Sequence, residues 1–145
     1  MIQKTITKDK MIPHYYGDYV RMLFLATALL IFVGIPFWGH LIPFGTMFEV
    51  VSGIILIVLA GLINPHSKWV MIVSAVVAGL GAFLLELSAI SFHAQHSMEL
   101  LVAREVGAIM LVTALYFSVK TVRAMMQGKV GERPVPWEFE EPTKE

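Results

Sequence analysis

Cysteine is absent from the 145 residues of this chain, which excludes disulfide bonds, thiolate catalysis and cysteine-ligated metals. Charged residues are scarce, at 15% of the chain, whereas about a quarter is usual in a soluble domain. The formal net charge is zero and gives no sign of nucleic-acid binding. A glycine-rich phosphate loop, a nucleophile elbow and an HExxH motif are also missing. We therefore expect a protein that is not an enzyme and does not bind nucleic acid.

Hydrophobic residues make up 57% of the chain, and most of them gather in four long runs. A helix rises about 1.5 Å per residue, so about 20 apolar residues cross the roughly 30 Å apolar core of a bilayer. The runs predict helices over residues 19–41, 47–63, 69–92 and 98–120, the last of which extends to about residue 126. We therefore expect an all-α integral membrane protein, with four transmembrane helices in an up-down-up-down bundle.

Polar segments flank the predicted transmembrane domain, 19–126. Residues 1–18 are interpreted as a cytoplasmic N-terminal segment, and residues 127–145, rich in proline and glutamate, as a flexible cytoplasmic tail. Basic residues favour the cytoplasmic face of a membrane. Both loops on the opposite side contain none, whereas ten of the eleven basic residues share one side: Lys4, Lys8, Lys10, Arg21, Lys68, Lys120, Arg123, Lys129, Arg133 and Lys144. This asymmetry predicts cytoplasmic N and C termini in a multi-pass cell-membrane protein, and we expect the inner membrane of a prokaryote.

Small and polar residues recur at helical spacing on one predicted face of the run 69–92 and just beyond its end: Ala75, Gly79, Ala82, Glu86, Ala89, His93 and His96. The next run contains one basic residue inside its apolar part, Arg104. Glu86 and Arg104 each lie nine residues from Gln95, the midpoint of the predicted hairpin, and so at matched depth. Because a lone charge in lipid costs several kcal/mol, we expect Glu86 and Arg104 to form a buried ion pair that faces the bundle interior.

Further ionisable residues gather near the predicted outer ends of the helices. His40 and Glu49 flank the first hairpin turn and are expected to face each other there. They join a candidate outer cluster for a cation or a metal: His40, Glu49, His93, His96, Glu99 and Glu105. Neutral imidazole and ionised carboxylate are ligands for zinc-like ions, although a His-x-x-His pair without a fixed third ligand is a weak signal.

Three functions remain open from the residues alone. The first is a non-enzymatic accessory or scaffold subunit, which packs against a membrane-protein partner or a second copy of itself within the lipid bilayer. The second is an oligomeric channel or transporter for small cations that uses the outer carboxylates. The third is a protein that binds a divalent metal or haem through the outer histidines. The sequence names no cofactor and no substrate.

Overall fold

The computed structural model describes residues 14–38, 45–91, 98–128 and 130 of the chain. Most of the predicted N-terminal segment 1–18 and of the predicted tail 127–145 lies outside these residues. Everything that is regular within them is helical. The all-α fold expected from composition is therefore confirmed for the described part of the chain.

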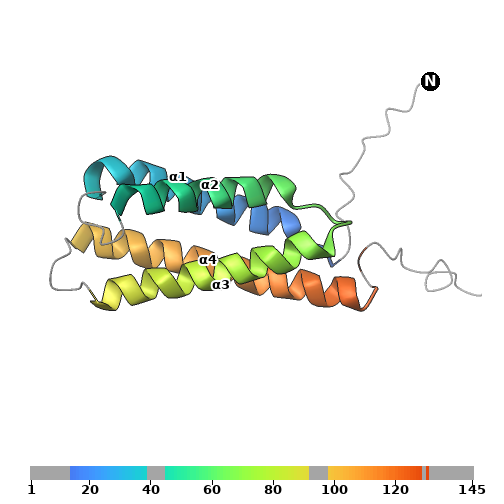
Figure 1. Ribbon diagram of the computed structural model, residues 1–145. Helices are drawn as coiled ribbons and strands as arrows, with labels where there is room; N and C mark the ends of the chain where they lie inside the picture. The colour runs from blue at the N-terminus through green and yellow to red at the C-terminus, as the bar shows by residue number, and fades with distance from the viewer. Residues whose placement is uncertain (1–13, 39–44, 92–97, 129, 131–145) are drawn as a thin grey trace, which may run out of the picture.

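The described part of the chain forms four helices: α1 (Gly17–Trp38), α2 (Gly45–Leu62), α3 (Lys68–Ser91) and α4 (Met98–Met126) (Figure 1). Each is long and apolar enough to cross a membrane, as the four apolar runs predicted. At about 1.5 Å per residue, the 18 residues of α2 span about 27 Å and the 29 of α4 about 43 Å. The shortest helix thus barely matches the apolar core of a bilayer, whereas the longest extends beyond it.

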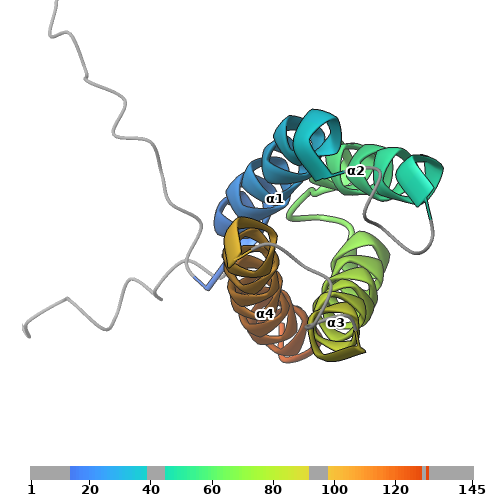
Figure 2. The ribbon, with the colours of Figure 1, turned by 90° about the vertical axis from the view of Figure 1, so that its left-hand side faces the viewer.

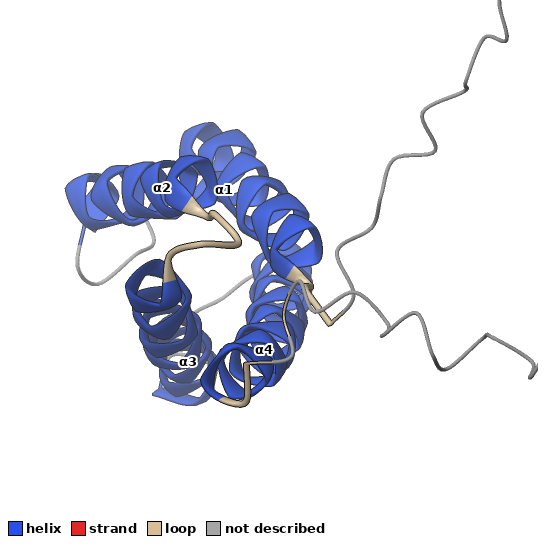
Figure 3. Ribbon diagram, turned by 90° about the vertical axis from the view of Figure 1, so that its right-hand side faces the viewer, coloured by secondary structure: helices blue, strands red, loops and turns tan. Residues whose placement is uncertain are grey.

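The helices lie side by side, and consecutive helices run in opposite directions (Figure 1). We call the end where α1 and α3 begin and α2 and α4 finish the termini end, and the opposite end the loop end. Packing is extensive between α3 and α4, between α1 and α2, and between α1 and α4, but α2 and α3 hardly touch. Viewed from the loop end, α2 stands well apart from α3 (Figure 2), whereas at the termini end a short loop joins the two (Figure 3). The bundle is therefore incompletely closed on its α2–α3 side.

Small side chains allow the helices to approach closely, as is usual in membrane bundles. The buried face of α3 runs through Met71, Ser74, Ala78, Ala82 and Ala89. This face is rotated by roughly 60° from the one predicted from the sequence, at 100° per residue. The predicted stripe advanced by 3.5 residues per turn on average, which drifts around a straight helix, so that only Ala82 and Ala89 belong to both faces.

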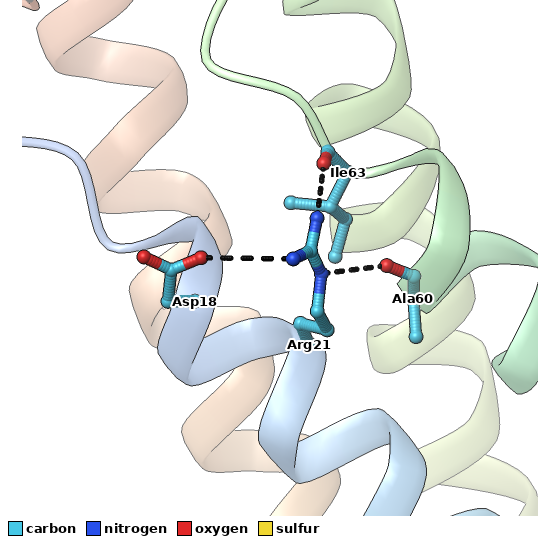
Figure 4. Close-up of polar contacts among 4 residues, drawn as sticks. All are labelled: Asp18, Arg21, Ala60 and Ile63. Carbon is cyan, nitrogen blue, oxygen red and sulfur yellow. Dashed lines mark hydrogen bonds and ion pairs between the residues drawn. The ribbon is translucent and has the colours of Figure 1, made fainter.

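Arg21 links α1 to the end of α2 at the termini end (Figure 4). Its Nε donates a hydrogen bond to the carbonyl oxygen of Ala60 at 3.0 Å, and a terminal nitrogen donates to that of Ile63 at 2.7 Å. The last carbonyls of a helix have no partner within it and form the negative end of its dipole, so a guanidinium there is doubly favourable. The ion pair between Arg21 and Asp18, at 4.0 Å and largely exposed, adds little.

Aromatic side chains link the start of α1 to the end of α4. Phe117 stacks on Tyr16 and on Tyr19, with ring centroids 5.6 and 5.4 Å apart, and the Lys120 ammonium lies 4.5 Å from the centre of the Tyr16 ring. The backbone N–H of Tyr16 donates to the buried Thr121 hydroxyl at 3.2 Å. Because this N–H precedes α1, it has no partner within a helix, and Thr121 satisfies it. The termini end is thus held by specific polar and aromatic contacts.

Candidate ligand-binding site

A cavity of about 330 Å³ lies within the loop-end half of the bundle, lined by residues of all four helices. The lining comes from residues 30–34 of α1, 48–56 of α2, 77–88 of α3 and 100–111 of α4. These stretches lie mainly in the second halves of α1 and α3 and in the first halves of α2 and α4, so the cavity lies toward the loop end. The volume is at the lower end of the range for small-molecule pockets in proteins.

Three of the lining residues are glycines: Gly34, Gly81 and Gly107. A Cβ atom on Gly107 would lie 3.2 Å from Cδ1 of Leu85, and one on Gly81 would lie 2.9 Å from Cδ1 of Leu111. Glycine at these two positions therefore lets α3 and α4 pack closely against each other. Space remains on the side of the cavity that faces α2, because α2 does not fill the gap.

Polar groups are few in the lining and include one carboxylate and one guanidinium. Glu49 lies in the second turn of α2 and is half-buried, and Arg104 lies in the second turn of α4 and is buried. Both side chains line the cavity, so that one carboxylate and one guanidinium from different helices share it. The hydroxyl groups of Ser52 and Ser88 complete the polar part. Most of the remaining lining is aliphatic, so the cavity pairs a polar portion with an apolar one.

The cavity opens between α2 and α3. Four residues of its lining are exposed, and all four belong to these two helices: Phe48 and Ile55 on α2, and Leu80 and Leu84 on α3. Every lining residue of α1 and α4 is buried or half-buried. In a bilayer, side chains exposed at this depth on a transmembrane helix face lipid rather than water. The mouth of the cavity is therefore apolar and directed sideways into the membrane.

The predicted buried pair of Glu86 and Arg104 is not found, because only Arg104 is buried. Glu86 is exposed on α3, and the carboxylate whose charge acts on Arg104 belongs to Glu49. Matched distance from a hairpin turn fixes depth in the bundle but not direction around the helix axis. The rotation of the buried face of α3 described above turns Glu86 outward, and this is the physical reason for the correction.

The other candidates for the outer cluster separate into two groups. His40, His93 and His96 lie outside the described residues, so the predicted histidine contribution to a metal or haem site stays a prediction. Glu99 and Glu105 are exposed on α4, and neither lines the cavity. Within the described ranges, no group of three or more histidine, aspartate or glutamate side chains is placed to hold a metal ion.

Sequence reasoning had paired Glu49 with His40 and had missed its relation to Arg104. A signal was nevertheless present. In an antiparallel four-helix bundle α2 and α4 both begin at the loop end, and Glu49 and Arg104 both lie within the first two turns of their helices. Ser52, one turn beyond Glu49 at an i, i+3 spacing, lies on the same face of α2.

Fold and composition together define the class, an α-helical multi-pass membrane protein. Comparison with family models, with curated proteins and with solved structures gives no match for this chain. Its function must therefore be argued from the cavity and the residues around it.

Proposed function

We propose that this protein is a non-enzymatic membrane protein that binds one amphipathic small molecule from the bilayer. The observation that carries the proposal is the cavity in the loop-end half, which is mainly apolar, has Glu49 and Arg104 in its lining, and opens between α2 and α3. An apolar cavity with a few convergent polar groups is the usual form of a small-molecule site. An opening toward lipid favours a ligand that is itself dissolved in the membrane.

A transmembrane helix of a partner is the competing occupant, because an accessory or scaffold role was the first expectation from the sequence. The cavity, at about 330 Å³, is at the lower end of the range for small-molecule pockets, and residues of all four helices of this chain line it. We therefore place an acyl or prenyl chain in the cavity rather than a helix. A partner helix or a second copy remains a proposal for the outer faces of the bundle.

Cation transport, the second expectation, needs a polar route along the whole bundle. In the described part of the termini-end half, the buried polar side chains are hydroxyls, among them Thr27 and Thr121. Both of these donate to a carbonyl of their own helix, at 2.8 Å each. Such hydroxyls are typical of packed membrane helices and supply no carboxylate for a cation. This half of the bundle therefore supports binding over conduction.

Binding can be tested by native mass spectrometry of the purified protein released from detergent micelles, with a monoacylglycerol as the probe. We expect one saturable copy per chain. Leu84→Trp, which enlarges a side chain of the cavity lining, should reduce this binding about tenfold or more. Leu87→Trp is the matched control, since Leu87 is exposed on the same helix and does not line the cavity. Equal binding by both variants would contradict a site in the cavity.

The proposed membrane topology places both termini in the cytoplasm and the loop end on the opposite side, on the strength of the basic residues. The absence of native cysteine makes labelling clean. A cysteine at Thr46, exposed at the loop end, should react with an impermeant maleimide in intact cells, whereas one at His66, exposed at the termini end, should react only after permeabilisation. Reaction at both positions in intact cells would overturn this topology.

A further inference from the structure

The charges that line the cavity restrict the kind of head group that it accepts. Glu49 and Arg104 come from different helices, α2 and α4, and line the same cavity of about 330 Å³. Taken together they carry no net charge. Resting on the proposed function, we infer that the ligand is an amphiphile with an uncharged head group that both donates and accepts hydrogen bonds, such as a hydroxyl-bearing glyceride.

A charged head group is disfavoured whichever its sign. An anion would be attracted by Arg104 but repelled by Glu49, and a cation would experience the reverse. Because the surroundings are apolar, these interactions are stronger than in water, and a third charge would leave one of the three without a partner. An uncharged head group leaves the attraction between Glu49 and Arg104 intact.

The lining contains both hydrogen-bond donors and hydrogen-bond acceptors, so the head group of the ligand should both accept and donate. A guanidinium has five N–H donors and accepts nothing, whereas an ionised carboxylate only accepts. The Ser52 hydroxyl donates its hydrogen to the carbonyl oxygen of Phe48 at 2.8 Å, so its oxygen faces a ligand as an acceptor. A ligand hydroxyl can accept from Arg104 and donate to Glu49 or Ser52. A head group with acceptors alone, such as an ester, fulfils half of this requirement.

The aliphatic part of the lining and the mouth of the cavity can accommodate the apolar chain of the ligand. Arg104 and Glu49 lie near the starts of α4 and α2, whereas the aliphatic lining continues toward mid-bundle, to Leu111 on α4 and Val77 on α3. A head group at the two charges therefore puts the chain against this aliphatic wall. Ile55 and Leu84, exposed lining residues on α2 and α3, mark the mouth through which it enters from lipid.

The test is a competition among three amphiphiles of equal chain length, measured by native mass spectrometry. They are a monoacylglycerol, an alkylsulfonate with a permanent negative charge, and an alkyltrimethylammonium with a permanent positive charge. The wild-type protein should prefer the monoacylglycerol by about tenfold or more over both ions. Glu49→Gln, which leaves Arg104 as the only charge of the pair, should move the preference to the sulfonate. The double variant Glu49→Gln, Arg104→Gln, which has no charge of the pair, should return it to the monoacylglycerol.

The matched control is Glu99→Gln, which removes a carboxylate that is exposed near the loop end and outside the cavity, and should leave the order unchanged. If the wild-type protein prefers either ion, or if Glu49→Gln does not change the order, the inference about the head group is wrong. The proposed function would still stand in that case, provided that Leu84→Trp abolishes the binding. If none of the three amphiphiles binds the wild-type protein, the proposed function itself fails.

Discussion

The two ends of this bundle use their polar residues in opposite ways. At the termini end, Arg21 bonds to carbonyl oxygens at the end of α2, and Thr121 accepts the N–H of Tyr16. Each of these groups satisfies a backbone atom that a helix end leaves without a partner. In the loop-end half, Glu49 and Arg104 line a cavity instead. Polar side chains at the termini end join helices to one another, whereas those in the loop-end half line a cavity in which a ligand can bind.

This difference follows from how α2 is held. Arg21 and the short connection to α3 fix α2 at the termini end, and α1 packs along it. The near absence of contact with α3 leaves the loop-end half of α2 without a neighbour on one side. Binding sites tend to occupy the less tightly packed parts of a protein. The comparison therefore assigns the joining of helices through polar contacts to the termini end and ligand binding to the loop end, and the following variants test the role of each polar residue.

The largest effect on stability is expected at Arg104, because its loss leaves the carboxylate of Glu49 without its opposite charge in an apolar setting. Arg104→Leu should lower the free energy of unfolding by about 3 kcal/mol, the lower end of the range for a buried charge that loses its opposite charge, since Glu49 is only half-buried. The double variant Glu49→Leu, Arg104→Leu should recover much of this loss. Unfolding by SDS in mixed micelles measures both. If the effects of the two single variants simply add, the residues are not coupled.

A smaller loss is expected for Arg21→Leu, which removes two charge-assisted hydrogen bonds to the end of α2. Because the Arg21 side chain is 43% exposed, we expect about 2 kcal/mol rather than more. Arg123→Leu, an exposed arginine at the end of α4, controls for the loss of a basic residue. The same SDS titration serves here. If Arg21→Leu and Arg123→Leu lower the free energy of unfolding equally, the hydrogen bonds of Arg21 do not stabilise the termini end.

Thr121→Val tests the contact between the start of α1 and the end of α4. We expect a loss of about 1 kcal/mol, since the N–H of Tyr16 is left without its acceptor. Thr113→Val is a close control, because both hydroxyls donate to the carbonyl four residues earlier, at 2.7 Å for Thr113 and 2.8 Å for Thr121. Thr121 differs in also accepting the Tyr16 N–H. Hydrogen exchange at Tyr16 should accelerate in the Thr121 variant and stay unchanged in the control.

Glu86→Leu should have the smallest effect, within about 0.5 kcal/mol of the wild-type protein in detergent, because Glu86 is exposed. This variant distinguishes the structure, in which Glu86 is exposed, from the predicted ion pair between Glu86 and Arg104. A loss comparable to that of Arg104→Leu, together with recovery in the double variant, would restore Glu86 as the partner of Arg104.

The sequence predicted the helices well because each depends on a local property, a run of apolar residues long enough to span a membrane. It also predicted that Arg104 is buried, since a lone guanidinium avoids lipid. Its partner could not be predicted from depth alone. Small residues occur on two neighbouring faces of α3, as Ser74 and Ala78 beside Ala75 and Gly79 show, so the small-residue pattern did not define the buried face.

The cavity could not be predicted from the sequence, for a different reason. It depends on the separation of α2 from α3, which no local pattern encodes, and on residues from four helices that meet only in the folded bundle.

The contrast between the two halves can be measured most directly by photo-cross-linking with a monoacylglycerol that carries a diazirine in its chain. Labelled peptides, identified by mass spectrometry, should include lining residues such as Leu111, and this labelling should fall in the presence of excess unlabelled monoacylglycerol and in Leu84→Trp. Ser74 and Ser118, fully buried in the termini-end half, should stay unlabelled. Labelling that does not compete, or that is confined to residues exposed on the outer surface, would contradict a ligand site in the loop-end half.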